Sequence, residues 1–337
     1  MRAIILSAYL LCLTGCASEA EDCVTVSLVC ALQQFDNDDH GDLKSVVVIQ
    51  NGEWLAERYY GGADAETLVD VRSAGKSVTS LLMGIAIDEN AIGSLQDPVE
   101  QYWPEAAGTA LGPIPLDAVL TMRTGLHADA DDPTSPGYED NMDTSDNPMA
   151  VALSVPKFEE PGTVYRYNSL AAYMAGMVIG NATGRGMEAF AQEKLFKPLG
   201  IERYDWQEDR DGTTKGQGNL FLTAAGFARI GQLVLNKGSF DGKQVVSERW
   251  INESLTPRVD ISSSTSNATH YGYYWYQNSL EIAGEPITYW FASGNGGNKI
   301  YIVPERQMVV TVMSTAYGQG RGHRRAKAIF QSVLEFQ

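Results

Sequence analysis

Hydrophobic and polar positions along the chain predict strands near both of its ends. Two β-rich runs, 45–50 and 53–60, are joined by Asn51-Gly52, a residue pair favoured in tight hairpin turns. Four further strand-like runs follow late in the chain, at 271–276, 287–291, 299–303 and 308–313. The first of these carries five aromatic rings, which a strand would turn alternately to its two faces. We therefore expect one sheet assembled from segments that are far apart in the sequence.

The middle of the chain carries helical patterns. A helix is expected over 73–89, and because it is apolar on every side we expect it to be buried. The section from about 97 to 222 is poor in strand patterns, and helices are expected there at 170–179 and 186–195. Two more helices are expected at 224–235 and 324–336. This arrangement predicts a helical subdomain inserted beside the sheet.

The first residues have the pattern of an export signal. A single basic residue, Arg2, is followed by an apolar run that is too short to span a bilayer and ends in small residues. The run closes with Leu13-Thr14-Gly15-Cys16, which resembles the lipobox of bacterial lipoproteins, where the cysteine is lipidated and becomes the first residue. We predict a signal peptide over 1–15 and a lipid anchor on Cys16. An ordinary signal peptide is the alternative.

This signal sets an expected location. Ala17 follows the cysteine at the position where an aspartate would favour retention in the inner membrane. We therefore expect a periplasmic lipoprotein of the bacterial cell envelope, held in the outer membrane by its lipid. Residues 16–42 are expected to form an acidic, irregular tether, and 43–337 the folded domain. In an oxidising compartment Cys23 and Cys30 are expected to form a disulfide, with two unpaired thiols as the alternative.

Composition excludes several classes of function. With 25 Lys and Arg against 42 Asp and Glu among 337 residues, the net charge of −17 excludes binding of nucleic acid through bulk charge. A hydrophobic share of 44% supports a large buried core. Seven carboxylates lie between 129 and 146 without the spacing of an EF-hand, so we expect an acidic, solvated loop that lies over the cleft and prefer this interpretation to a calcium site. We predict neither a metal nor another cofactor.

The reactive residues are concentrated at the start of the predicted buried helix. Ser73 and Lys76 are three residues apart, which places both side chains on one helical face. The amide of a serine in the first turn is also free to bind an oxyanion. A second Ser-x-x-Lys, at 154–157, contains a proline that obstructs a helical turn. No Gly-x-Ser-x-Gly occurs, so an α/β-hydrolase triad with His127 or His270 is a poor competitor.

Several motifs besides Ser-x-x-Lys occur in a characteristic order. They are Ser73-x-x-Lys76, Met122-Arg-Thr-Gly-Leu126, Pro161-Gly-Thr-Val-Tyr-Arg-Tyr167-Asn168-Ser169, Phe221-Leu-Thr-Ala-Ala-Gly-Phe-Ala-Arg229 and Gly294-Asn-Gly-Gly297. This order resembles the serine hydrolases of the β-lactamase and penicillin-recognising superfamily, and most of all its class C-like branch of esterases, D-amino-acid peptidases and 6-aminohexanoate-dimer hydrolases. The resemblance implies an α/β fold, an α+β sandwich in which an antiparallel sheet is flanked by helices and an all-helical subdomain is inserted at about 97–222.

The resemblance also implies roles for individual residues. Ser73 would be the acylated nucleophile, Lys76 its hydrogen-bonded partner, and Tyr167 the residue that acts with the lysine as general base. Ser169 would take the third position of the motif that begins with this tyrosine, where relatives carry asparagine. Gly294 allows close approach of its strand, and the Asn295 N–H can join the Ser73 N–H in an oxyanion hole.

The strand motif beside the nucleophile departs from the pattern of the superfamily. β-Lactamases carry Lys-Thr-Gly there and many relatives carry His-x-Gly, whereas this chain has Ala292-Ser293-Gly294. The motif thus lacks a cation for a substrate carboxylate, and Arg166 is expected to point away from the face that Tyr167 uses. We therefore expect uncharged short-chain esters or amides to be preferred over β-lactams.

These observations predict a secreted serine hydrolase that cleaves small esters or amides through an acyl-enzyme at Ser73. Its partners would be a small-molecule substrate and, through the lipid, a membrane. Two alternatives remain at this point. One is a catalytically inactive penicillin-binding-like protein that binds cell-wall peptide or another partner, and the other is a true β-lactamase or D-Ala peptidase.

Overall fold

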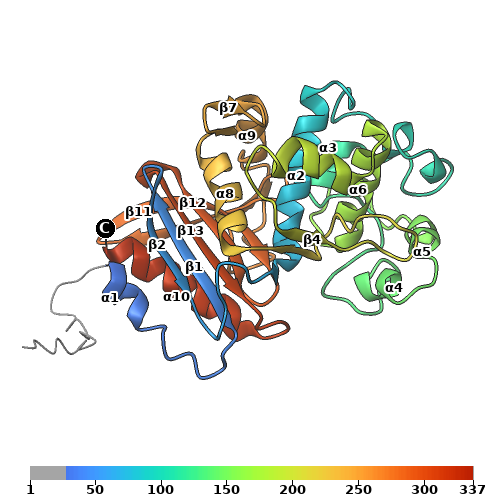
Figure 1. Cartoon of the computed structure of the whole chain (residues 1–337). Coiled ribbons are helices and arrows are strands. Elements are labelled where there is room, and N and C mark those ends of the chain that lie inside the picture. The colour runs from blue at the N-terminus through green and yellow to red at the C-terminus, as the bar shows by residue number, and fades with distance from the viewer. Residues whose placement is uncertain (1–27, 337) are drawn as a thin grey trace, which may run out of the picture.

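An eight-stranded antiparallel sheet forms one side of the molecule (Figure 1), seen in a computed structural model that describes residues 28–336. The strand order is β2-β1-β13-β12-β11-β10-β9-β8. The strands are β1 (Leu43–Gln50), β2 (Glu53–Tyr59), β8 (Val259–Asp260), β9 (His270–Tyr271), β10 (Tyr276–Ile282), β11 (Glu285–Gly294), β12 (Asn298–Val303) and β13 (Met308–Ser314). Because β1 pairs with β13, the two ends of the described chain meet in one sheet, which confirms the predicted fold class.

The hairpin between β1 and β2 forms as its sequence predicts. Asn51 has a φ of 52° and Gly52 a φ of 82°. Both values lie in the left-handed region, which the favoured hairpin turn requires and which Asn and Gly tolerate best. The hairpin places β1 in the sheet interior, where Val46, Val47 and Val48 are fully buried.

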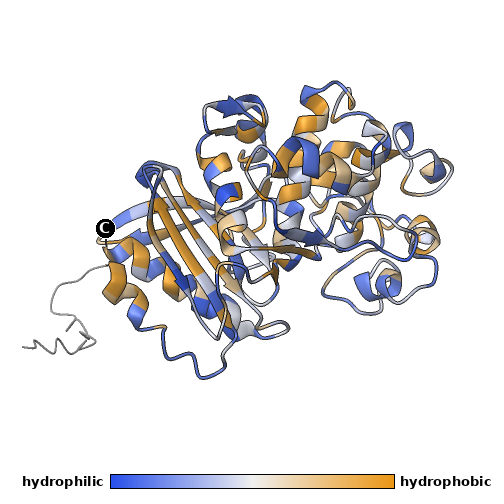
Figure 2. Ribbon diagram, viewed as in Figure 1, coloured by the Kyte–Doolittle hydropathy of each residue, from blue (hydrophilic) through white to orange (hydrophobic). Residues whose placement is uncertain are grey.

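Helices cover both faces of the sheet (Figures 1 and 2). The helix α8 (Ala224–Leu235) packs on β1, β12 and β13, and α10 (Gly320–Phe336) packs on β12 and β13. On the α10 side, the ring of Phe330 stacks on Tyr301 with centroids 4.1 Å apart. On the α8 side, Gly231 lies so close to Val309 and Ile300 that a Cβ there would meet their methyl groups at 2.6 and 2.7 Å.

A short helix, α1 (Leu28–Gln33), lies within the segment predicted to be an irregular tether. Its Leu28 and Leu32 are buried, and the helix packs against α10. The side chain of Gln34 donates a hydrogen bond to Ser332 at 3.1 Å. The packed body therefore begins before residue 43, because two leucines of this segment find an apolar surface on α10.

The remaining helices form a second region beside the sheet (Figure 1). They are α2 (Gly75–Asp88), α3 (Leu116–Leu120), α4 (Glu139–Asp143), α5 (Pro148–Ser154), α6 (Ser169–Thr183), α7 (Met187–Ala191) and α9 (Glu248–Ser254). The helix α2 packs against α6 and α9, and its residues 75–86 are all buried, as its apolar composition predicts. Two short strands, β4 (Tyr204–Trp206) and β5 (Leu220–Leu222), also occur here. β5 pairs with β4 on one side and with β3 (Val69–Asp70) on the other, so the inserted segment is mainly rather than entirely helical. The small hairpin β6 (Ser239–Phe240) and β7 (Lys243–Gln244) completes the list.

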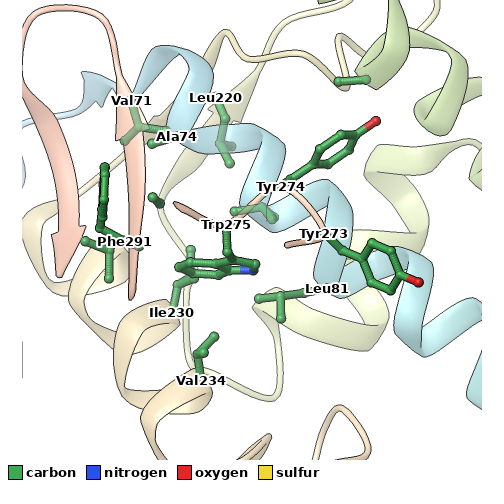
Figure 3. Close-up of a cluster of buried hydrophobic side chains, with 14 of the residues drawn as sticks. Val71, Ala74, Leu81, Leu220, Ile230, Val234, Tyr273, Tyr274, Trp275 and Phe291 are labelled. Carbon is green, nitrogen blue, oxygen red and sulfur yellow. The ribbon is translucent and has the colours of Figure 1, made fainter. Parts of the chain in front are cut away.

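The prediction of one strand over 271–276 is wrong. Tyr271 ends β9 and pairs with Tyr276, the first residue of β10, so the four residues between them form a tight turn in which Tyr274 has a φ of 61°. Figure 3 shows Trp275 pointing into the cluster that contains Ile230, whereas Tyr273 and Tyr274 point away from it. The Tyr273 hydroxyl donates to the Asp117 carboxylate at 2.8 Å, so these rings pack against different neighbours rather than alternating along a strand.

The predicted lipid anchor on Cys16, the predicted disulfide between Cys23 and Cys30, and metal binding are taken in turn. The lipobox around Cys16 lies outside the described residues, as does Cys23; Cys30 is disulfide-bonded, and its pairing with Cys23 stays a prediction. Among residues 28–336 there is no helix with the length and apolarity that crossing a membrane requires. In the same part of the chain, no three His, Cys, Asp or Glu side chains gather as a metal site needs.

Candidate active site

Ser73 lies in a short 3-10 helix, η1 (Arg72–Ala74), that leads directly into α2. Val71 and Ala74, which lie on either side of Ser73 in the chain, are fully buried. With Leu220 they belong to the apolar cluster drawn in Figure 3. Ser73 itself is half-buried. The core thus holds the turn on both sides while the serine hydroxyl stays accessible.

The residue before the serine has an unusual backbone conformation. Arg72 has a φ of 53°, which is strained for a residue with a side chain. Asp70 holds it there, because its carboxylate accepts the Arg72 N–H at 2.8 Å and forms an ion pair with the guanidinium at 3.1 Å. Burial nevertheless raises the pKa of Asp70 above its ordinary value. The Arg72 guanidinium also lies 4.4 Å from the ring centre of Tyr317.

Lys76 is one turn along from the serine and is only 2% exposed. Its Nζ donates to Ser73 Oγ at 3.0 Å and to the Gln217 carbonyl at 2.8 Å, and it lies 3.4 Å from Ser169 Oγ. No carboxylate of residues 28–336 forms an ion pair with it. The buried Lys76 amine group, whose hydrogen-bond partners are all neutral, is aimed at the serine oxygen, as the spacing of three predicts.

Tyr167 joins this group from the loop before α6. Its ring centre lies 5.2 Å from Lys76 Nζ. The next residue, Asn168, caps α6 by accepting the Ala171 N–H at 2.8 Å, so it has a structural role. Ser169 then begins the helix and faces the lysine. The structure therefore brings together Ser73, Lys76, Tyr167 and Ser169.

The acidic loop, residues 129–146, reaches this group through one carboxylate, a contact that the sequence did not predict. Ser169 Oγ donates a hydrogen bond to the carboxylate of Glu139, the first residue of α4. Glu139 is one of the seven carboxylates between 129 and 146 that we expected to be solvated. Gln217 was also missed, because it contributes a backbone carbonyl rather than a recognisable side chain.

The strand β11 runs directly against the serine turn. A Cβ on Gly294 would lie 1.9 Å from the Val71 carbonyl oxygen and 3.1 Å from the Ala74 nitrogen, so only glycine fits. The next residue, Asn295, accepts the Gly318 N–H at 2.8 Å with its side chain, which fixes the end of the strand. The close approach brings the Asn295 backbone to the edge of the site, beside the turn that carries Ser73.

The strand motif itself carries no cation, but a lysine of the neighbouring strand reaches it. Lys299 of β12 pairs across the sheet with Ser293, and its Nζ donates to Ser293 Oγ at 2.6 Å. Burial lowers the pKa of Lys299 to about 7. Arg166, by contrast, lies in no strand, and ion pairs at 2.8 and 2.9 Å with Asp129 and Glu159 neutralise it.

A cavity of about 800 Å³ opens beside Tyr167. Ser293 and Lys299 line it, together with aromatic side chains of the sheet and basic residues of α10. Besides Tyr167 and Lys299, the aromatic and basic lining residues are Tyr165, Arg166, Tyr276, Tyr289, Phe291, Tyr301, His323, Arg324 and Lys327. Of Ser73, Lys76, Tyr167 and Ser169, Tyr167 is the one that lines this cavity, so the room for a small organic molecule lies on the tyrosine's side of the group.

The competing serine and histidines are placed elsewhere. Ser154 is the last residue of α5, so the second Ser-x-x-Lys forms no helical turn, and Lys157 pairs with Glu160 instead. The ring of His127 stacks on Phe158 with centroids 4.6 Å apart. None of these residues forms a nucleophile–base pair.

A family model described as Beta-lactamase matches residues 40–334, nearly the whole described chain. The chain belongs to the Beta-lactamase family. This family is one of hydrolases, and its members share the sheet-and-helix fold seen here.

Relatives of this Beta-lactamase family member include enzymes with several activities. A 6-aminohexanoate-dimer hydrolase of Paenarthrobacter ureafaciens is 25% identical over 292 residues, which are 80% of this chain and 71% of the relative. The solved structure of a family VIII carboxylesterase is similar with a TM-score of 0.71 and 18% identity, covering 90% of this chain and 96% of that one. A class C β-lactamase has a TM-score of 0.67 and 16% identity, with 91% and 94% covered. The two structures support the fold, and the substrate has to be argued from the site.

Proposed function

We propose that this protein is a serine hydrolase that cleaves small esters or amides through an acyl-enzyme at Ser73. The observation that carries the proposal is the 3.0 Å contact between Lys76 Nζ and Ser73 Oγ, on a turn that the Gly294 strand touches. A nucleophile in hydrogen-bond reach of its base, beside backbone donors for an oxyanion, is the arrangement that acyl transfer requires.

The residues divide the acyl-transfer steps among them. Ser73 Oγ attacks the substrate carbonyl carbon and gives its proton to the Lys76–Tyr167 pair. The N–H groups of Ser73 and Asn295 stabilise the oxygen that becomes negative. The bond to the leaving alcohol or amine then breaks, and Tyr167 returns the proton to the leaving group. Water enters in its place, gives a proton to the same pair and attacks the acyl carbon. The bond from that carbon to Ser73 Oγ then breaks, the pair returns the proton to Ser73, and the acyl group leaves as a carboxylic acid.

The relative named as a 6-aminohexanoate-dimer hydrolase and the carboxylesterase neighbour support amides and esters as the bonds to test. We also propose that the protein acts in the cell envelope, on the strength of the lipobox at Leu13-Thr14-Gly15-Cys16. A binding protein without activity would not need a buried lysine directed at an accessible serine.

Hydrolysis of a small substrate panel tests this proposal. Purified protein is assayed with p-nitrophenyl butyrate, the linear dimer of 6-aminohexanoate and a chromogenic cephalosporin. We expect turnover of the ester or the amide that disappears in Ser73→Ala and persists in Ser154→Ala, a matched serine on another helix. Equal turnover by the Ser73→Ala protein would refute the acyl-enzyme, and no turnover by the wild type would favour a binding protein.

A further inference from the structure

The two oxyanion donors of the proposed mechanism come from different parts of the chain. One is the N–H of Ser73, in the 3-10 helix η1, and the other is the N–H of Asn295, which directly follows β11. Such donors stabilise a transition state only when both lie about 3 Å from the position of the negative oxygen. Catalysis therefore depends on what holds the serine turn and the end of β11 in one fixed relation.

The segment between β13 and α10 contacts both sides of this arrangement. The Gly318 N–H donates to the side chain of Asn295 at 2.8 Å. One residue earlier, the Tyr317 hydroxyl donates to the backbone carbonyl of Asp70 at 2.9 Å, three residues before the serine. Gly296 follows Asn295, and a Cβ on it would lie 2.9 Å from the Tyr317 ring. Two consecutive residues, Tyr317 and Gly318, thus join the serine turn to the end of β11.

The side chains of Asp70 and Arg72 complete this connection on the serine side. Asp70 is 3% exposed, and its carboxylate accepts the Arg72 N–H at 2.8 Å and pairs with the guanidinium at 3.1 Å. The same guanidinium lies 4.4 Å from the ring centre of Tyr317, in cation–π range. Tyr317 therefore contacts the backbone of Asp70 with its hydroxyl and the side chain of Arg72 with its ring.

The backbone of Arg72 needs these contacts. Its φ of 53° is strained for a residue with a side chain, and such a conformation persists only where the surrounding structure holds it. The backbone angles of Arg72 also set the plane of the peptide bond that joins it to Ser73, and the Ser73 N–H lies in that plane. A relaxation of Arg72 would therefore turn the first oxyanion donor away from its place.

We propose that Asp70, Arg72 and Tyr317 form a clamp that positions the Ser73 and Asn295 N–H groups for catalysis. This inference rests on the proposed function. The three are positioning residues, because each acts through the backbone of the serine turn or of the end of β11. The substrate oxygen becomes negative only in the transition state, so the clamp should affect the rate of acyl transfer more than the binding of substrate.

Two conservative substitutions test the clamp. Tyr317→Phe removes the hydroxyl and keeps the ring, and Asp70→Asn removes the charge and keeps the size. Outright loss of an oxyanion donor lowers kcat by about a hundredfold or more, so displaced donors should lower kcat for p-nitrophenyl butyrate by about tenfold in each variant, with KM changed less than about threefold. A lower urea midpoint with wild-type kcat would make these residues structural and overturn the proposal.

A tyrosine at the opposite edge of the sheet provides the matched control. Tyr59 ends β2, four strands away from β11, and its hydroxyl donates to the Glu57 carboxylate. Tyr59→Phe loses one hydroxyl hydrogen bond, as Tyr317→Phe does, but far from the serine turn. We expect Tyr59→Phe to keep the kcat and KM of the wild type. An equal fall in kcat in both variants would show a general effect of losing a tyrosine hydroxyl and would contradict the clamp.

A transition-state analogue measures the oxyanion donors without turnover. When propylboronic acid binds, boron accepts Ser73 Oγ as its fourth ligand, the serine proton passes to the Lys76–Tyr167 pair, and the boronate anion places an oxygen where the oxyanion forms. We expect the Kd from calorimetry to rise in each clamp variant by the same factor by which kcat/KM falls. A structural defect would lower the fraction of protein that binds and leave Kd unchanged, which would refute the proposal.

The combined variant tests whether the residues act together. Tyr317→Phe with Asp70→Asn should lower kcat by less than the product of the two single effects, because both act on the turn that contains Arg72. Single effects that multiply in full would contradict one shared clamp. Turnover and boronate binding that are lost in Ser73→Ala but unchanged in both clamp variants would refute the clamp alone. Absence of both in the wild type would refute the proposed function, and the clamp with it.

Discussion

Replacing Lys299 by methionine should stabilise the folded protein, and by an amount that depends on pH. Lys299 is buried, and burial lowers its pKa from 10.5 to about 7. A lysine whose pKa is lower in the folded state opposes folding wherever the unfolded chain would hold the proton. Methionine has a similar length and no charge, so it removes this cost.

The size of the effect follows from the two pKa values. One pKa unit corresponds to about 1.4 kcal/mol, so a pKa lowered from 10.5 to about 7 costs about 5 kcal/mol below pH 6. The cost is about 4 kcal/mol at pH 7, about 2 kcal/mol at pH 9, and it vanishes above pH 11, where neither state is protonated. Because this cost shrinks as pH rises, Lys299 makes the free energy of unfolding of the wild type increase between pH 7 and pH 10.

Unfolding in urea at pH 7 and pH 9 measures this difference. Lys299→Met should have a larger free energy of unfolding than wild type. This difference should be about 2 kcal/mol smaller at pH 9 than at pH 7. Burial, and next the charge of Lys299, lower the pKa of His323 to about 4, so this neighbour is already neutral in the wild type at both pH values. The exposed Lys243→Met should show no such change. If the difference in free energy of unfolding were the same at both pH values, the claim that Lys299 is a buried, unpaired amine with a lowered pKa would be refuted.

Four other variants test the site and the signal. Lys76→Ala and Tyr167→Phe should each lower kcat for ester hydrolysis by about a hundredfold or more, and the urea midpoint of Tyr167→Phe should stay near that of wild type. Normal turnover by either variant would remove the substituted residue from the mechanism. Gly294→Ala should lower kcat by about a hundredfold and cost about 1–3 kcal/mol of stability, because its Cβ would lie 1.9 Å from the Val71 carbonyl oxygen; wild-type kinetics would contradict this packing. Cys16→Ala should leave an unprocessed, unlipidated precursor, as seen by mass and membrane fractionation, and normal processing would favour an ordinary signal peptide.

Much of the fold could be predicted because its signals are local. Asn51-Gly52 determines a hairpin through its backbone preferences alone, and the apolar run after Ser73 determines a buried helix through its composition. Ser73 and Lys76 could be paired in the same way, since three residues of helix bring them together.

The features that could not be predicted depend on contacts between distant segments. Lys299 meets Ser293 only because of the register between β11 and β12, and a one-residue shift would turn it to the other face. Glu139 reaches Ser169 because the acidic loop folds back over α6, which no local pattern encodes. The aromatic run over 271–276 has strand-like composition, but tertiary packing of its rings on separate neighbours imposes a turn.

Covalent labelling of Ser73 is the most direct test of the central claim. A fluorophosphonate probe is applied to the full chain, and the modified residue is located by peptide mass spectrometry. Two serines serve as internal controls: Ser77, whose Oγ is buried and donates to the Tyr274 carbonyl, and Ser154 at the end of α5. We predict stoichiometric modification of Ser73 alone and none in Ser73→Ala. Labelling that persists in Ser73→Ala, or that falls on another serine of the wild type, would contradict the account.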